Sequence, residues 1–234
     1  MANKRSHDSF YASEGKMPVK ESFKFIASLL EKYSQDSFSI ADIGCAIGAF
    51  PEYLRSVFPQ AKVVGYEYLD SLIDVGRAMY PGLTLKKASV LERGEVCDRY
   101  DVVTCLGVLS IFDDIKLPVS NLCQWVNPGG KLIIHGMYNP DDVDVFIKYQ
   151  FPINYGNSEY ETGWNIVSQK TLSSILREYG AKKITYHPFH ISIDLIRKDD
   201  DPLRSWTERM EDGKKQIING LCIKQPQYVV EVDM

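Results

Sequence analysis

The sequence lacks long hydrophobic runs, paired cysteines and clustered basic residues. No window of about 18 residues is apolar enough for a transmembrane helix, and the N-terminal segment lacks the apolar core of a signal peptide. The five cysteines are scattered and none forms a CxxC pair, so we expect free thiols in a reducing, cytoplasmic setting and no structural zinc. The net charge of −4 and the absence of a basic run argue against a nucleic-acid partner.

The chain has 234 residues, 44% of them hydrophobic, and this suits a single domain with a buried core. Short apolar runs alternate with helical periodicities as far as residue 137. This alternation predicts an α/β fold, a parallel sheet with helices on both faces. Strands are expected at 38–43, 62–67, 83–87, 101–106 and 131–137, helices at 20–33, 48–58, 69–79 and 114–126, and a turn at 127–130.

The second half of the chain has a different pattern. Residues 138–167 contain Asn, Asp, Tyr, Gly and Trp with little periodicity, which is typical of a loop that covers a binding site. A helix is predicted at 168–179, with Ser168 as its N-cap and Gly180 just past its end. Strands are predicted at 183–186 and 191–196, interrupted at His187-Pro188, then a hairpin within 207–218 around Asp212-Gly213, and a last strand at 228–232.

A glycine-containing turn joins the first predicted strand to the following helix. The segment DIGCAIG places Gly44 and Gly48 at the edge of the sheet where open α/β folds bind ligands. Asp42 would repel a pyrophosphate and suits a cation, such as the amino group of an amino acid. Glu67 ends the next strand, where a carboxylate can accept hydrogen bonds from both hydroxyls of a ribose. The pattern favours a nucleoside-bearing amino acid, although Glu67 alone does not separate this ligand from NAD.

Residues 36–137 resemble the class I S-adenosylmethionine-dependent methyltransferases. DIGCAIG is similar to the family motif D-x-G-x-G-x-G, with Ala46 in place of one glycine, and Glu67 in VVGYEYLD matches the ribose-binding acid. KASV at 87–90 is similar to the segment that lines adenine, although the family often has Asp where Ser89 stands. DVVTCLGVLS and NPGGKLII resemble the fourth and fifth strands with their turns.

This resemblance implies a Rossmann-like, doubly wound, mostly parallel seven-stranded sheet with an antiparallel C-terminal edge. S-adenosylmethionine would be the methyl donor and S-adenosylhomocysteine the product. Within one domain, 1–234, the implied parts are an N-terminal arm and helix (1–35), a donor-binding core (36–137), an acceptor-covering loop (138–167) and the completion of the sheet (168–234). The implied donor contacts are Asp42, Gly44, Cys45, Ala46, Gly48, Glu67, Tyr68, Ser89, Val90, Leu106 and, from the arm, Tyr11.

Methyl transfer requires alignment of donor and acceptor, and an oxygen or nitrogen acceptor can also need a base. His135, near the end of the fifth strand, is the candidate catalytic base. Other candidates have simpler interpretations as structural histidines, a solvated histidine or helix caps: His187, His190, His7, Asp113 and Asp114. The acceptor pocket is expected to draw on polar-tipped aromatic and amide side chains in the loop, namely Tyr138, Tyr155, Tyr160, Trp164 and Asn165.

Residues 201–221, DPLRSWTERMEDGKKQIINGL, resemble the tails of methyltransferases that modify sugars and surface polysaccharides. The implied acceptor is a small polar molecule, a sugar or sugar nucleotide, methylated on oxygen. Several alternatives stay open on the sequence: another small metabolite or a protein as acceptor, a nicotinamide-dependent oxidoreductase on a similar sheet, and a non-catalytic module that binds S-adenosylmethionine. The sequence predicts no oligomeric state.

Overall fold

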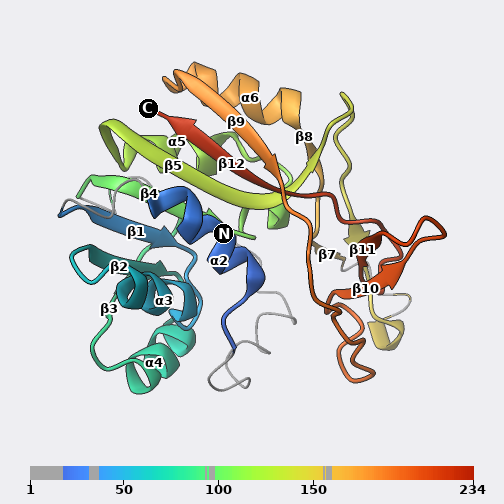
Figure 1. Cartoon of the computed structure of the whole chain (residues 1–234). Coiled ribbons are helices and arrows are strands. Elements are labelled where there is room, and N and C mark those ends of the chain that lie inside the picture. Colours follow the sequence, from blue (N-terminus) through green and yellow to red (C-terminus); the bar gives the residue numbers. More distant parts are fainter. Residues whose placement is uncertain (1–17, 32–36, 93, 95–97, 155, 157–159) are drawn as a thin grey trace.

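A twisted sheet forms the centre of the molecule in the computed structural model, which describes residues 18–31, 37–92, 94, 98–154, 156 and 160–234 (Figure 1). The strand order is β3-β2-β1-β4-β5-β12-β9. The first five strands in this order are parallel, whereas β12 runs antiparallel to β5 and β9 antiparallel to β12. The strands are β1 (Ser39–Ile43), β2 (Lys62–Glu67), β3 (Thr84–Lys87), β4 (Tyr100–Leu106), β5 (Val126–Asn139), β9 (Lys183–Pro188) and β12 (Gln227–Asp233).

The predicted fold class is confirmed, with one addition. Seven strands follow one path with an antiparallel C-terminal edge, and a short strand, β8 (Val167–Ser168), pairs with the end of β5. None of the helices in the described part of the chain has the length and hydrophobicity needed to cross a bilayer.

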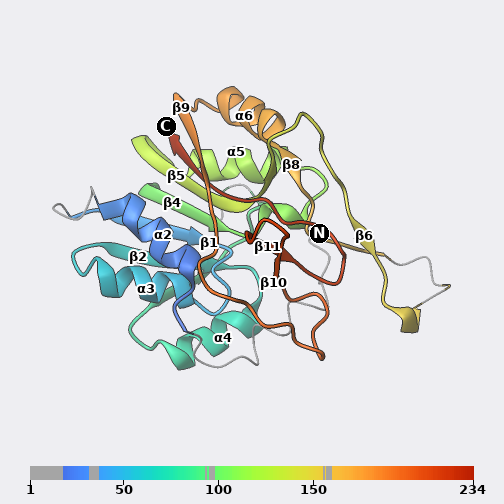
Figure 2. The same cartoon turned by 45° about the vertical axis from the view of Figure 1, so that its right-hand side comes forward.

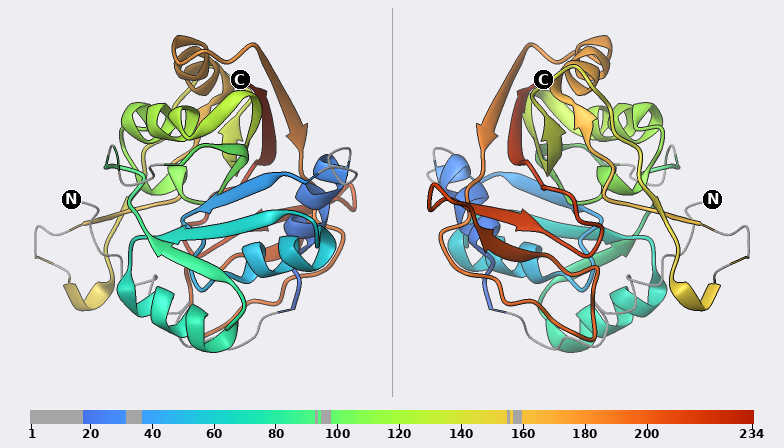
Figure 3. Two further views of the ribbon diagram at one scale, coloured as in Figure 1. Left: turned by 90° about the vertical axis from the view of Figure 1, so that its left-hand side faces the viewer. Right: turned by 90° about the vertical axis from the view of Figure 1, so that its right-hand side faces the viewer.

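Helices cover both faces of the sheet (Figures 1 and 3). One face packs against α2 (Glu21–Leu30) and α3 (Ala49–Val57), and the other against α5 (Lys116–Gln124) and α6 (Gln169–Glu178). α4 (Asp70–Met79) packs beside β3 at the edge of the sheet. The helical spacing in the sequence explains this packing, because α2 buries Phe23, Ile26, Ala27 and Leu30, which recur on one side of the helix.

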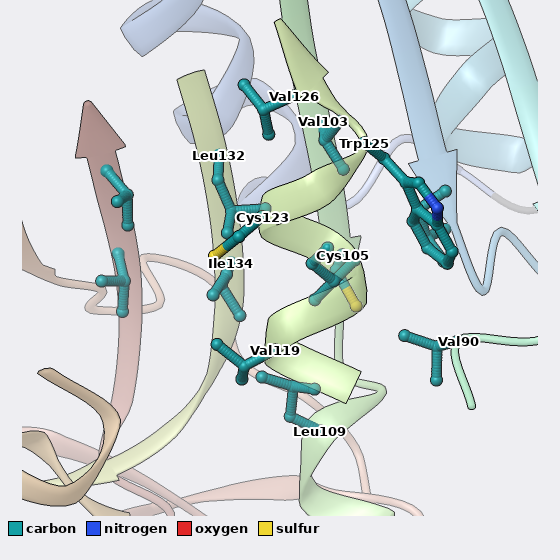
Figure 4. Packing of buried hydrophobic residues seen from close by; sticks show 14 of the residues in the cluster. Val90, Val103, Cys105, Leu109, Val119, Cys123, Trp125, Val126, Leu132 and Ile134 are labelled. Atoms are coloured by element: carbon teal, nitrogen blue, oxygen red, sulfur yellow. The ribbon is translucent and has the colours of Figure 1, made fainter. Parts of the chain in front are cut away.

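The larger core lies between the sheet and α5 (Figure 4). Val103 of β4 and Ile134 of β5 pack there against Val119 of α5, and all three are fully buried. Burying each such side chain stabilises the fold by about 2 kcal/mol. This core fixes β4 and β5, whose ends carry candidate site residues.

Three predicted features differ in the structure. Residues 127–130 do not form a separate turn, because they lie inside β5 as an irregularity in its pairing with β4. Residues 191–196 do not form a strand: among the described residues they join no ladder, although the Thr207 amide donates to the Leu195 carbonyl (3.1 Å), and the Ile193 and Ile196 side chains face solvent. The expected break at His187-Pro188 is absent: both residues belong to β9, an edge strand, where a proline without an N–H is tolerated.

Two irregular regions lie beyond the carboxyl ends of the parallel strands (Figures 1 and 2). The predicted loop at 138–167 contains the short ladder of β6 (Lys148–Tyr149) with β7 (Glu161–Thr162), and a 3-10 turn, η4 (Pro152–Asn154). The second region, residues 189–226, is called the C-terminal lobe below. It contains the predicted hairpin, β10 (Trp206–Arg209) with β11 (Lys215–Ile218).

Candidate active site

The turn between β1 and α3 contains three residues in left-handed backbone conformations. The φ angle is +74° at Gly44, +50° at Ala46 and +87° at Gly48. The amides of Gly44 and Cys45 both donate to the Tyr66 carbonyl, over 2.8 and 3.0 Å, so the turn folds onto the end of β2. The left-handed conformation costs a residue with a Cβ about 1 kcal/mol or more, and Ala46 accepts this cost where the family motif has glycine.

The two glycines of this turn also lie in close contact with neighbouring side chains. A Cβ on Gly44 would overlap Val108, which follows β4, and a Cβ on Gly48 would overlap Leu83, which precedes β3. The backbone of the turn therefore lies directly against two segments. One follows β4, at the carboxyl edge of the sheet, and the other precedes β3.

Glu67, at the end of β2, connects the glycine turn to the turn that follows β2. One carboxylate oxygen accepts a hydrogen bond from the Ala46 amide (2.9 Å), and the other accepts from the amides of Tyr68 (2.8 Å) and Leu69 (3.0 Å). The Glu67 residue is 8% exposed. These donors hold the carboxylate of Glu67 in one orientation at the strand end, although the sequence had suggested ribose hydroxyls as its partners.

Asp42 is buried one strand away, on the same face of the sheet as Glu67. It pairs in register with Gly65, which lies two residues before Glu67 on β2. The Thr104 hydroxyl donates to the Asp42 carboxylate over 2.7 Å. Burial raises the pKa of Asp42 to about 7, the Thr104 hydrogen bond opposes this rise, and the negative charge of Glu67 adds to it. A cation beside Asp42 would stabilise its ionised form.

The predicted adenine segment lies at the end of β3. Ser89 and Val90 are both buried, and the Ala88 amide donates to the Glu67 carbonyl over 3.1 Å. The Ser89 hydroxyl accepts from the Leu91 amide (3.1 Å). The structure thus brings this segment beside Glu67. Of the other predicted donor contacts, Cys45 is buried, Leu106 is half-buried, Tyr68 is exposed, and Tyr11 lies outside the described residues.

His135 lies on β5, level with Leu106 of β4 and Val229 of β12. Its ring meets the Phe189 ring edge-on, with centroids 5.7 Å apart. Its Nε2 atom is buried and has no hydrogen-bond partner among the described residues. Burial, with a smaller contribution from Lys20, lowers the pKa of His135 to about 4, so its imidazole is neutral at pH 7.

The other candidate bases within the described residues are hydrogen-bonded or ion-paired to neighbouring groups, or are exposed to solvent. His187 contacts Glu231 over 3.2 Å, and His190 is exposed. Asp113 forms an ion pair with Lys148, while Asp114 accepts from the Lys116 amide (2.8 Å) at the start of α5. His7 lies outside the described residues.

The acceptor-pocket residues expected from the loop are not gathered at one place. Tyr138 packs in the core on the face opposite His135, beside Tyr186, and Tyr160 is exposed. Trp164 packs on Tyr149. Asn165 is buried and ties the loop down, since it donates to the Phe112 carbonyl (2.9 Å) and accepts from the Ile147 amide (2.7 Å). Tyr155 lies outside the described residues.

Sequence reasoning missed Thr104, Val108, Phe189 and Gln225. Thr104 and Val108 act through strand register and close packing, which a single sequence does not reveal. Phe189 and Gln225 come from the chain after β9 and before β12, and only the return of the C-terminal strands brings them to this edge. Within the described residues, no group of three or more His, Cys, Asp or Glu side chains could hold a metal ion.

A family model described as "Methyltransferase domain" matches residues 16–186. The chain belongs to the methyltransferase domain family. Its fold is that of the class I S-adenosylmethionine-dependent methyltransferases, and S-adenosylmethionine is the cofactor of this family.

The chain is similar to several named proteins. A curated relative, malonyl-[acyl-carrier protein] O-methyltransferase of Bacillus anthracis, is 24% identical over 125 residues, or 53% of this chain and 46% of the relative. The matched segment thus spans about half the length of that relative. CalS10, an amino pentose methyltransferase of Micromonospora echinaspora with S-adenosylmethionine bound, is 14% identical over 99% of this chain and 98% of its own, with a TM-score of 0.60. The PH0226 protein of Pyrococcus horikoshii is 11% identical over 99% of each chain, with a TM-score of 0.61.

Proposed function

We propose that this protein transfers the methyl group of S-adenosylmethionine to an oxygen of a small polar acceptor, a sugar or a nucleotide-linked sugar. The observation that carries this proposal is the placement of Asp42 and Glu67. Two buried carboxylates lie on one face of the sheet, at or near the carboxyl ends of neighbouring strands, on either side of the glycine turn. Such a pair suits a ligand with an ammonium group at one end and a ribose at the other.

The residues around this turn fit the donor. Asp42 would bind the ammonium group, and this contact would also explain why a buried acid with a raised pKa is kept there. Glu67 would accept the ribose hydroxyls, beside or in place of the amides that now hold it. The other assigned donor contacts are Gly44, Cys45, Ala46 and Gly48 of the turn, Tyr68 beside the ribose, Ser89 and Val90 beside adenine, Leu106 beside the amino acid, and Tyr11.

The bound donor supplies an electrophilic methyl group, and the protein aligns the acceptor and handles its proton. We assign this proton to His135. A neutral imidazole has one ring nitrogen that can accept a hydrogen bond, and the low pKa of His135 keeps the ring neutral across the physiological range. The acceptor hydroxyl would donate to Nε2 and pass its proton to this nitrogen as the oxygen–methyl bond forms and the methyl–sulfur bond of the donor breaks, which leaves S-adenosylhomocysteine. The loop at 138–167 and the C-terminal lobe would exclude water above the edge.

The sugar as acceptor is supported by residues 201–221, which resemble the tails of sugar-modifying methyltransferases, and by a protein of the same fold that methylates an amino pentose. On this basis we place the activity in the biosynthesis of a surface polysaccharide, in the cytoplasm. A second acceptor class, a malonyl group on an acyl-carrier protein, has its own support, because a curated relative is a malonyl-[acyl-carrier protein] O-methyltransferase. That acceptor would present a carboxylate, which needs no base.

A methyl-label transfer experiment tests this proposal. The protein is incubated with S-adenosylmethionine labelled in the methyl group and, separately, with nucleotide-linked sugars, free amino sugars and malonyl-carrier protein. We expect label in a nucleotide-linked sugar, stable to mild base as an ether is. Label in the carrier protein that is lost in mild base would indicate a methyl ester. The acceptor would then be the malonyl carboxylate and not a sugar. Donor binding without transfer to any of these would favour a non-catalytic module.

A further inference from the structure

Gln225 lies two residues before β12, whose first residue, Gln227, pairs with Met137 near the carboxyl end of β5. The backbone amide of Gln225 donates to the Ile217 carbonyl of β11 over 2.9 Å. The next residue, Pro226, accepts from the Tyr138 amide near the end of β5 (3.1 Å). Contacts with both the lobe and β5 therefore fix the backbone of Gln225 just beyond the strand end.

The carboxamide of Gln225 is buried, and only its oxygen is hydrogen-bonded within the described residues. The residue is 5% exposed. Its Oε1 accepts from the Ser205 hydroxyl (2.9 Å) and from Gln227 Nε2 (3.4 Å). The oxygen end of the carboxamide is assigned from these two contacts. The Nε2 group, with two N–H donors, has no hydrogen-bond partner among the described residues.

Gln225 lies on the same side of the sheet as His135. Its side chain touches that of Gln227, so the two point to the same side, and strand alternation places Gln227 on the side of Val229. Val229 is the register partner of His135. His135 Nε2 and Gln225 Nε2, two buried nitrogen atoms without partners in the part of the chain that the structure describes, thus belong to the same side of the same edge. Gln225 is four residue steps from Val229, about 13 Å along an extended chain, which is more than an acceptor of one or two carbons could span.

We propose that Gln225 determines acceptor specificity, with its Nε2 donating a hydrogen bond to an acceptor oxygen other than the one that is methylated. This inference rests on the proposed function. It predicts an acceptor with at least two oxygens several ångströms apart, one facing His135 and one facing the C-terminal lobe. A sugar with several hydroxyls meets this requirement. Gln225 forms no bond in the reaction and positions the acceptor for His135.

The experiment uses the full chain saturated with S-adenosylhomocysteine, and the probes are uridine, guanosine and thymidine diphosphate sugars. Calorimetry finds the probe that binds. Gln225→Glu keeps the shape and the oxygen that Ser205 contacts but removes the N–H donors, and Gln225→Met removes the donors without adding charge. We expect each variant to weaken probe binding about tenfold or more. Binding of S-adenosylhomocysteine should change little. The melting temperature should fall in Gln225→Glu, which buries a carboxylate, and fall less in Gln225→Met.

A control and a spectroscopic readout separate this role from a structural one. Gln216→Glu, on β11 of the same lobe, adds the same charge and should leave probe affinity unchanged. In wild-type protein labelled with 15N-glutamine, the side-chain amide signals of Gln225, identified by their loss in Gln225→Met, should shift when the probe is added. Equal probe affinity in wild type and both Gln225 variants would overturn the inference, as would failure of every probe to bind wild type. Failure of wild type to bind S-adenosylhomocysteine would instead overturn the proposed function itself.

Discussion

Val108 occupies the space that a side chain on Gly44 would need. The two residues belong to the turns that follow β4 and β1, so this contact brings the glycine turn against the chain that leaves the central strand. The relationship explains why Gly44 is required even apart from its backbone angle. It also connects the glycine turn to the segment that leads towards Asp113, which Asn165 of the loop at 138–167 contacts.

Gly44→Ala should destabilise the protein by about 2–4 kcal/mol, because it combines a left-handed φ with overlap against Val108. Adding Val108→Ala should restore part of this loss, since it removes the overlap and leaves the φ strain. Gly107→Ala is the matched control: its φ is also +74°, but nothing lies within 4 Å of the added Cβ, so about 1 kcal/mol is expected. Urea unfolding measures all four proteins. Equal losses for Gly44→Ala and Gly107→Ala would contradict the packing argument.

Asp42→Asn should stabilise the donor-free protein and weaken donor binding. The pKa of Asp42 is raised in the folded state, so the unfolded chain releases this proton at lower pH than the folded one does. The resulting destabilisation grows as pH rises from about 4 to about 7 and is complete above that range. Asp42→Asn keeps the oxygen that accepts from Thr104 and removes the penalty, on the order of a few kcal/mol at pH 8 and much less near pH 4. Thermal unfolding at the two pH values checks the sign; a larger gain at the lower pH would refute it.

Donor affinity should depend on pH through the same group. The ammonium of the donor needs ionised Asp42, so affinity should be level above a pH of about 7 and fall about tenfold per unit below it. Calorimetry with S-adenosylhomocysteine from pH 5.5 to 8.5 measures this slope, and Asp42→Asn should remove it. A slope that survives in Asp42→Asn would show that another group titrates.

His135→Gln should lower turnover by roughly 10²–10⁴-fold while leaving donor affinity within a factor of two or so. In wild type, turnover should stay level down to a pH near 4 as far as His135 is concerned, because its pKa is lowered to about 4. Phe189→Ala should let water reach the ring, raise the pKa of His135 and move an acid limb of the rate profile to higher pH. Turnover of His135→Gln equal to that of wild type would remove this residue from the mechanism.

The sequence predicted the parallel half of the fold well because short buried strands and amphipathic helices leave different periodicities. It also predicted the histidine on β5 and the two acids near the ends of their strands. It could not predict that Thr104 would pair with Asp42, since that contact depends on the register between β1 and β4. The alternating pattern at 191–196 predicted a strand, but a strand needs a ladder of hydrogen bonds, and within the described residues the only backbone–backbone hydrogen bond to this segment runs from the Thr207 amide to the Leu195 carbonyl. Tyr138 was predicted as a pocket residue, yet the extension of β5 places it in the core on the other face.

The central claim is that Asp42 and Glu67 bind the donor together, and titration of S-adenosylhomocysteine tests it most directly. Calorimetry would compare wild type with Asp42→Asn, Glu67→Gln and Asp74→Asn, the last being an exposed acid on α4 that controls for the charge change. The account predicts binding to wild type and to Asp74→Asn with equal affinity, and affinities at least tenfold lower for Asp42→Asn and for Glu67→Gln at pH 8. Unchanged affinity in both site variants, with their folds intact, would contradict it.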